Sequence, residues 1–379
     1  MMQQTLWGSL IGIGIGIIAQ TAWALEREPG ASVPGSFHGY GELHYNNPEG
    51  SGVPGKDDPA QFDMHRTVFG WSYAWNDQIS LHAEVDFEHS FKEPELEFAY
   101  LDYLMRPELN VRAGLMLMPV GPLNEFHEPP LFYSVERSYV NKFVIPTTWQ
   151  EAGAGIFGSH ANLQYRLYLV SGLNSKGFTA KDGIRKGRQH AAEAPSEEIA
   201  AVGRIEYIGV PGLTAAASAY RGGANQDKGT KDVGVGILEG DLRYKKSGFD
   251  LTAVWVQINI DHPENAVDEA GALTKVGKKI MGHSLEVAYH LLPVLLPGTT
   301  KDLVPFVRWE RFNTQKETPA AYAADPKYDR KVVTAGFAYY PIPEVAMKAD
   351  WERWEDQGTD PAAEHDGTRV NLGLAYMFN

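Results

Sequence analysis

Two acidic side chains on one face of an extended segment are the first residues in this chain that could carry chemistry. Glu84 and Asp86 stand two positions apart, so in a β-strand their carboxyl groups would lie about 7 Å from each other. Paired carboxylates at such a separation can act together on one bond. The same spacing is typical of an acidic wall in contact with water, and we predict the wall rather than a catalytic pair.

Histidine side chains raise the question of a metal site. The chain has 12 histidines, with His38 and His44 in one segment and His82 and His89 in another. These pairs lack the tight spacing of metal ligands, and the chain contains no cysteine that could complete such a site. We therefore expect wall or loop histidines and no metal.

A serine nucleophile can be imagined where Ser134 and Ser138 follow His127. The G-x-S-x-G motif that would support it is absent, and that motif belongs to a different fold. The sequence therefore predicts no catalytic residues and no bound cofactor, and the protein is not expected to be an enzyme.

The segments that carry these residues alternate between apolar and polar positions. From Ile79 to Phe87 every odd-numbered residue is apolar and every even-numbered residue is polar, and a similar period recurs at 345–352 and 369–378. A period of two predicts β-strands. An apolar outer face and a polar inner face are what a transmembrane barrel requires, although a soluble sandwich would show the same period.

Connection lengths separate these two folds. Connections after odd-numbered strands are mostly long and those after even-numbered strands mostly short, as in bacterial outer-membrane barrels. We therefore predict an all-β protein, a 16-stranded antiparallel transmembrane β-barrel. The predicted strands are 36–46, 62–75, 78–88, 95–105, 109–118, 149–158, 161–172, 197–208, 212–222, 233–245, 248–259, 280–291, 302–312, 331–340, 344–355 and 368–379.

The N-terminal segment predicts export. Its apolar run from Leu6 to Ile18 is shorter than the roughly 20 residues of a spanning helix. Ala22 and Ala24 are small residues at the two positions that a signal peptidase reads, and they predict a signal peptide, residues 1–24, with an uncleaved anchor as the alternative. Residues 25–379 would form one outer-membrane barrel domain. The net charge of −14 argues against nucleic acid as a partner.

The third long connection, residues 119–148, is too apolar and aromatic for a simple surface loop. Folding into the barrel would bury Leu123, Phe126, Leu131, Phe132 and Tyr133, and would narrow the bore; a subunit contact is the alternative. The predicted constriction residues are Glu125, His127, Glu128, Tyr133, Glu136, Arg137 and Lys142.

The next long connection is basic, with Lys176, Lys181, Arg185, Lys186 and Arg188, and we expect a solvated loop, or else an anion funnel or a lipopolysaccharide contact.

Several motifs are similar to those of one family. Residues 99–103 (AYLDY), 107–114 (PELNVRAG), 118–121 (MPVG), 135–138 (VERS) and 146–158 (PTTWQEAGAGIFG) resemble the phosphate-selective porin O/P family. The resemblance is specific from about Ala99 to Gly158. It implies a 16-stranded porin, commonly trimeric, through which small solutes diffuse passively.

Charges on the predicted inner wall make phosphate an unexpected solute. Acidic residues outnumber basic ones there, and an acidic lumen should disfavour phosphate and mildly favour cations. The basic residues are Arg112, Arg166, Arg204, Arg243, Arg308, Lys348 and Arg369, against Glu84, Asp86, Glu88, Asp102, Glu206, Glu239, Asp241, Asp250, Glu286, Glu310, Asp350 and Glu352. The candidate lumen-wall site is Glu84, Asp86, Asp102, Arg112, Arg166, Arg204, Arg308, Glu310 and Asp350.

These patterns predict a porin of a Gram-negative outer membrane that forms a passive, water-filled channel for small ionic solutes. We expect a homotrimer embedded in outer-membrane lipid. The alternative is a scaffold barrel that encloses a protein partner, such as a redox or secretion component. Outer-membrane barrels usually end in an aromatic residue, whereas here the aromatic Phe378 is followed by a last residue, Asn379.

Overall fold

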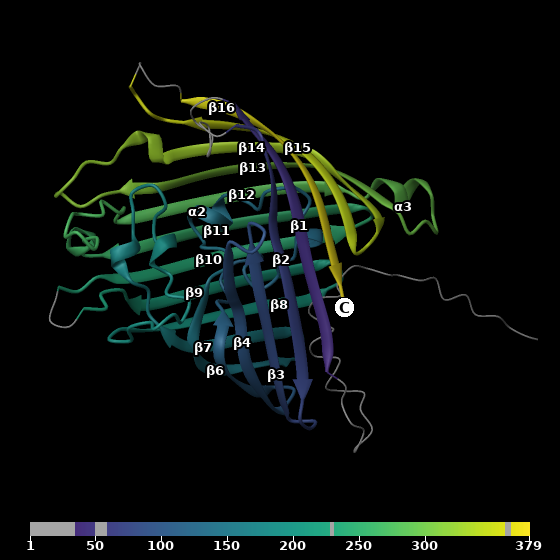
Figure 1. Ribbon diagram of the computed structural model, residues 1–379, viewed down its shortest axis with the longest axis horizontal. Coiled ribbons are helices and arrows are strands. Elements are labelled where there is room, and N and C mark those ends of the chain that lie inside the picture. The colour runs from purple at the N-terminus through teal and green to yellow at the C-terminus, as the bar shows by residue number, and fades with distance from the viewer. Residues whose placement is uncertain (1–34, 50–58, 228–230, 361–364) are drawn as a thin grey trace, which may run out of the picture.

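A computed structural model describes residues 35–49, 59–227, 231–360 and 365–379, and the predicted signal peptide lies outside them. The described chain folds into one closed barrel (Figure 1). Its strands are β1 (Ser36–Glu49), β2 (Gln61–Ala74), β3 (Ile79–Glu88), β4 (Glu93–Arg106), β5 (Leu109–Leu117), β6 (Gln150–His160), β7 (Leu163–Ser171), β8 (Ile199–Val210), β9 (Leu213–Gly223), β10 (Gly234–Lys246), β11 (Phe249–Asp261), β12 (Lys279–Tyr289), β13 (Asp302–Glu317), β14 (Asp329–Ile342), β15 (Val345–Asp356) and β16 (Asp366–Phe378).

Each strand pairs antiparallel with its neighbours in the chain, and β1 pairs with β16 to close the ring. In that closing pair Gly39 lies opposite Phe378 and Glu49 opposite Thr368. Closure leaves no unpaired sheet edge. The prediction of a 16-stranded antiparallel barrel is confirmed.

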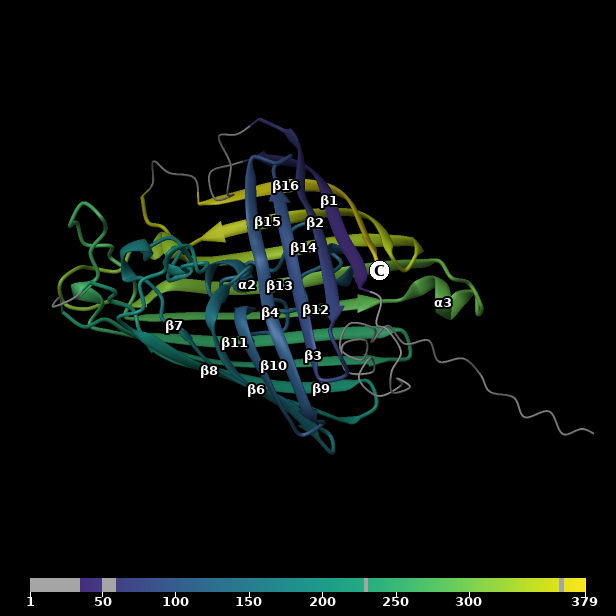
Figure 2. The ribbon, with the colours of Figure 1, turned by 60° about the horizontal axis from the view of Figure 1, so that its bottom comes forward.

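Short connections join the strands at the end of the barrel where the C-terminus lies (Figure 1). Ser247 and Gly248, between β10 and β11, have φ angles of 53° and 85°, as a type I′ hairpin turn requires. The connection from β12 to β13 is longer and contains the short helix α3 (Leu291–Leu295), which is also at this end (Figure 2).

The two faces of the barrel wall differ in polarity. Large apolar side chains on alternate positions are exposed on the outside, and polar side chains between them are buried on the inside. This is the polarity that a membrane barrel requires. The exposed residues include Leu101, Leu169, Ile205, Leu238, Trp255, Leu285, Trp309, Phe337, Trp351 and Leu372. No helix among the described residues is long and apolar enough to cross a membrane.

Two long connections pack inside the barrel. We call residues 118–149 the first inner loop; it contains the 3-10 turn η1 (Pro129–Leu131) and the helix α2 (Val140–Phe143). Residues 172–198 are the second inner loop, with η2 (Ser175–Gly177) and η3 (Arg185–Gly187). Both loops join the inward-facing side chains of β10–β12 in one hydrophobic cluster, which includes Phe143, Val144, Phe178, Ile184, Val256, Ile258 and Ile280.

Burial in the first inner loop differs in part from the prediction. Phe132 and Tyr133 are buried, Leu123 and Phe126 are partly buried, and Leu131 is exposed. The interior is also more filled than the strand count alone predicted, because the second inner loop lies there as well. Two 3-10 turns, η4 (Pro263–Asn265) and η5 (Pro326–Tyr328), lie in the remaining long connections.

Candidate functional site

Carboxylates on the inner wall hold the first inner loop in place. The backbone N–H of Val135 donates to Oδ2 of Asp350 on β15 (2.6 Å). Glu310 on β13 accepts from the hydroxyl of Ser138 (2.6 Å) and from the backbone N–H of Val140 (3.0 Å). Since Asp350 and Glu310 are buried, these loop donors satisfy oxygens that would otherwise lack partners.

Basic side chains on the same part of the wall also contact the loop. Arg308 donates to the hydroxyl of Ser134 (2.5 Å) and pairs with Glu310 (2.8 Å). The ammonium of Lys348 donates to the carbonyl oxygens of Pro129 (2.6 Å) and Ser134 (2.9 Å). Arg308 therefore compensates a wall carboxylate, and both basic side chains fix the path of the loop.

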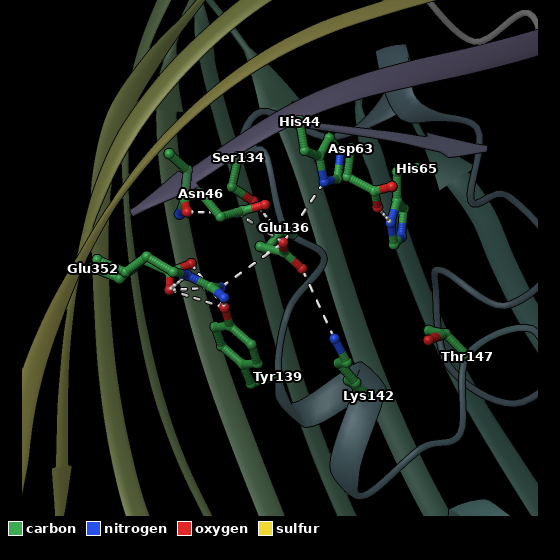
Figure 3. A network of polar contacts seen from close by, with 12 residues as sticks. His44, Asn46, Asp63, His65, Ser134, Glu136, Tyr139, Lys142, Thr147 and Glu352 are labelled. Carbon is green, nitrogen blue, oxygen red and sulfur yellow. Dashed lines mark hydrogen bonds and ion pairs between the residues drawn. The ribbon is translucent and has the colours of Figure 1, made fainter. Parts of the chain in front are cut away.

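Glu136 is the centre of a polar network between the loop and the wall (Figure 3). Its carboxylate accepts from the amide of Asn46 on β1 (3.2 Å) and lies 3.7 Å from Nδ1 of His44. Lys142 from α2 and Arg369 from β16 approach the carboxylate to 3.9 Å each. Residues of β1, β16 and α2 thus meet at one loop carboxylate.

Tyr139 makes a second contact between the loop and β15. Its hydroxyl donates to both oxygens of Glu352, at 2.9 Å each (Figure 3), and its ring lies edge-on to Trp354 with centroids 4.3 Å apart. Arg369 pairs with the same carboxylate at 3.0 Å. The sequence placed Glu352 and Arg369 on the inner wall, and the structure shows that they pair with each other and with the loop.

The N-terminal half of the first inner loop contacts other strands. Glu125 pairs with Arg166 on β7 (3.2 Å). Nε2 of His127 lies 3.0 Å from the hydroxyl of Tyr40 on β1 and 3.1 Å from a carboxylate oxygen of Glu97 on β4. The loop therefore spans the interior between opposite parts of the wall.

Three further predicted constriction residues lie on this loop. The hydroxyl of Tyr133 donates to Asp250 on β11. One carboxylate oxygen of Glu128 and one guanidinium nitrogen of Arg137 are buried, and neither has a hydrogen-bond partner within the described part of the chain. The predicted constriction set is therefore spread along the loop rather than gathered in one ring.

The wall formed by β8–β10 holds its charges without the loop. Arg204 on β8 pairs with Glu206 (2.7 Å), Glu239 (3.3 Å) and Asp241 (2.7 Å). All four side chains are almost completely shielded from solvent. The Arg204 guanidinium thus pairs with three carboxylates, and Arg166 and Arg243 approach two of them to between 3.6 and 3.8 Å.

The remaining predicted wall residues also face the interior. Arg112 donates to both oxygens of Asp102, at 2.8 and 2.9 Å, and Asp86 lies 3.8 Å from Arg66. The structure places the predicted wall residues in separate ion pairs: Glu84 pairs with His38 and Asp86 with Arg66. Arg166 and Arg204 both pair with Glu206.

Exposure divides the charged residues into two groups. The carboxylates of Glu310, Glu352 and Asp241 are fully shielded. By contrast, 38% of the Lys142 side chain and 23% of the Arg243 side chain are exposed. A count of wall charges taken from the sequence therefore overstates the negative charge that a solute would meet.

The second inner loop holds the first by its arginines. Arg188 donates to the carbonyl oxygens of Thr147 and Thr148 at 2.6 Å each, and Arg185 donates to the carbonyl oxygen of Lys142 at 3.1 Å. Burial, with the nearby charge of Arg188, lowers the pKa of Arg185 to about 9, so its guanidinium stays charged at neutral pH. The expectation of a simply solvated loop was wrong for these two residues.

Sequence reasoning missed inward-facing charges next to two strand irregularities. The pairing of β1 with β2 shifts between Glu42 and Leu43, where His65 is the extra residue, and the pairing of β3 with β4 shifts at Glu84, where Glu97 is extra. A β-bulge changes which side chains face inward. The alternation breaks at these points, which is the signal that could have found Arg66 and Glu97.

Comparison with solved structures identifies the class of fold. The structure resembles the outer membrane channel DcaP of Acinetobacter baumannii (TM-score 0.61, 11% identity, 93% of this chain and 99% of that chain) and OmpF of Salmonella typhi in complex with daunomycin (0.60, 12%, 91% and 97%). It also resembles a trimer form of OmpT, an outer membrane protein of Vibrio cholerae (0.55, 11%, 92% and 100%). The chain has the fold of the outer-membrane porins.

One sequence relative is similar enough to define a family. An uncharacterized protein of Aquifex aeolicus (strain VF5) is 32% identical over 361 residues, which cover 90% of this chain and 80% of that protein, and the chain belongs to the same family as that protein. No family model matches the chain. The resemblance to phosphate-selective porins therefore stays a prediction, while the broader prediction of a porin fold is confirmed.

Proposed function

We propose that the protein is a passive channel of the outer membrane, filled with water, through which small ionic solutes diffuse. The observation that carries this proposal is the closed barrel with an apolar outer face and a charged inner face, inside which the first inner loop is fixed by wall residues. A bore lined by charged side chains and narrowed by a loop filters solutes by size and charge without chemistry.

Solutes would meet the charges that remain partly exposed. Lys142 on the first inner loop and Arg243 on β10 are the basic candidates, and Glu125 and Glu136, each with 13% of the side chain exposed, are acidic ones. Because the most shielded wall charges are mainly carboxylates, the exposed set is more balanced than the sequence count. We therefore propose weak selectivity between cations and anions, without specific binding of phosphate.

The scaffold alternative requires a bore that can accept a protein partner. Both inner loops occupy the interior and share one hydrophobic cluster with the wall, so a partner would have to displace them. Catalysis would need a nucleophile that a substrate can reach, and Ser134 and Ser138 are both buried in contact with Arg308 and Glu310. These contacts favour a channel over a scaffold or an enzyme.

We also propose a homotrimer in the outer membrane. Exposed leucine, tryptophan and phenylalanine side chains around the barrel suit contact with lipid or with a second barrel. The resemblance to a trimer form of OmpT supports this state. Mass measurement of the protein in mild detergent tests it, with a trimer mass as the expected result.

Single-channel recording in a planar bilayer tests the channel proposal. We expect stepwise conductance, a small reversal potential under a KCl gradient, and no reduction of current when phosphate is added. Block by phosphate with strong anion preference would overturn the weak selectivity. A folded barrel that gives no conductance would overturn the channel and favour the scaffold.

A further inference from the structure

Two histidines and an aspartate converge near the end of the barrel that carries the long connections. Oδ2 of Asp63 on β2 lies 3.1 Å from Nδ1 of His65 and 2.8 Å from Nδ1 of His89, which follows β3. The ligand atoms of these three residues all lie within 4.8 Å of one another. We call Asp63, His65 and His89 the histidine cluster.

The backbone adopts irregular conformations to bring the cluster together. His65 is the extra residue of the bulge in β2, so it and Arg66 occupy one step of the pairing with β1. His89 has a φ of 49°, in the left-handed region that only a few per cent of residues other than glycine adopt. Its backbone N–H donates to the carbonyl oxygen of His65 (3.1 Å), which fixes the two histidines beside each other.

Both basic and acidic side chains lie next to the histidine cluster. His44 stacks on His65, with ring centroids 4.6 Å apart and planes 13° from parallel, and lies beside Asp63 in the close view (Figure 3). The ligand atoms of Glu88 and Glu93 lie within 4.8 Å of that of His89. Arg66 and His44 are the nearby basic groups; Arg66 is paired with Glu42, Asp86 and Glu88, and His44 is paired with Glu42 at 2.9 Å.

We propose that the histidine cluster binds a divalent transition-metal ion such as Zn²⁺. Two imidazole nitrogens and one carboxylate oxygen form a ligand set that suits zinc and similar metals, and magnesium prefers oxygen ligands. Two ligands of a tetrahedral zinc ion lie about 3.3 Å apart, given metal–ligand bonds of about 2.0–2.1 Å. The observed separations of 2.8 and 3.1 Å between Asp63 and the two histidines are close to that value.

The cluster is also accessible to an ion in solution. Between a quarter and about a third of each side chain is exposed, with 26% for Asp63, 29% for His65 and 36% for His89. Three protein ligands leave coordination positions for water, so the ion could exchange with solution. This proposal goes beyond diffusion of solutes, because it assigns a binding site on the wall.

Calorimetric titration of the full-length folded protein in detergent with ZnCl₂ at neutral pH tests the site. We expect one saturable site per chain that MgCl₂ does not fill. His65→Ala and His89→Ala should each weaken binding by at least about tenfold, since even the loss of a group that only orients a ligand has such an effect. Asp63→Asn keeps the shape of the side chain and should weaken binding as well.

His38→Ala is the matched control, because His38 also contacts a carboxylate, that of Glu84 at 2.8 Å, but among the described residues it belongs to no group of three possible metal ligands. This variant should bind zinc as the unaltered protein does. The proposal would be overturned if the His89→Ala and Asp63→Asn variants bound zinc as tightly as the unaltered protein. It would also be overturned if His38→Ala lost as much affinity as the cluster variants. The heat-dependent shift in gel mobility shows whether each variant is folded, and His89→Gln replaces any variant that is not. Zinc binding is measured without conductance, so a failure of the channel proposal would leave this result unaffected.

Discussion

The inner wall of β13–β16 and the inner wall of β8–β10 stabilise buried carboxylates by different means. On the first, Asp350, Glu310 and Glu352 accept hydrogen bonds from neutral donors of the first inner loop. On the second, Arg204 pairs with Glu206, Glu239 and Asp241, and Arg243 makes longer contacts to two of the same carboxylates. The buried carboxylates of β13–β16 therefore fix the position of the first inner loop, whereas those of β8–β10 are compensated by cations of the wall itself.

This difference shows why wall charges do not act alike on a passing solute. A buried carboxylate that accepts several hydrogen bonds is a structural anchor, and breaking its contacts leaves an unpaired charge or donor. Substitutions in the two regions should therefore have different consequences. Loss of an anchor should release the loop, whereas loss of Arg204 should destabilise the wall without moving the loop.

Arg204→Met should give the largest effect. It leaves three shielded carboxylates with reduced compensation, and we expect a loss of roughly 3–5 kcal/mol in the free energy of unfolding, the typical result of breaking a buried ion pair. Urea unfolding in micelles measures it. Arg221→Met is the control, since Arg221 forms an exposed pair with Asp261 on β11 (2.6 Å), and exposed pairs contribute about 0–1 kcal/mol. Equal destabilisation in both variants would contradict the central role of Arg204.

Glu310→Ala should release the first inner loop. Ser138, Val140 and Arg308 all lose their common acceptor, and we expect destabilisation of about 3 kcal/mol together with a higher single-channel conductance. Glu310→Gln keeps an acceptor for the loop donors, so its conductance should remain close to that of the unaltered protein. If both variants conduct alike, the loop is held by other contacts.

Gly282→Val should shift the loop by steric pressure rather than by charge. A Cβ atom added at Gly282 on β12 would lie 2.9 Å from Val144 and 3.0 Å from Val140. Overpacking of this kind costs about 1–3 kcal/mol, and we expect changed conductance with intermediate stability in urea. Gly240→Val on β10 is the control, because an added Cβ would meet only one atom, at 3.8 Å. If Gly282→Val conducts as the unaltered protein does, the position of α2 does not depend on this contact.

The sequence predicts which residues face inward and fails to predict what they contact. Alternation fixes the phase of each strand, so Arg204, Glu310 and Asp350 could be assigned to the inner wall from the sequence. The partners of Glu310 lie 170 and 172 residues away in the chain, on a loop whose path no local pattern determines. The bulge at His65 changes the phase by one residue, so the histidine cluster could not be recognised from spacing.

Lys142→Glu should have the smallest effect and tests the exposed charges directly. The Lys142 ammonium lies 3.9 Å from Glu136, and 38% of the side chain is exposed, so the substitution reverses a charge that solutes can approach. We expect the reversal potential in a KCl gradient to move by several millivolts toward cation preference, with little change in stability. The shift should fade as salt rises, because the screening length falls from about 10 Å at 0.1 M to about 3 Å at 1 M. Lys327→Glu is the control, because it changes the net charge by the same amount. Lys327 lies on η5 in a long connection, where it pairs with Asp325 at 2.8 Å, and its substitution should shift the potential less. An equal shift in the two variants would mean that total charge, rather than the loop inside the bore, sets selectivity.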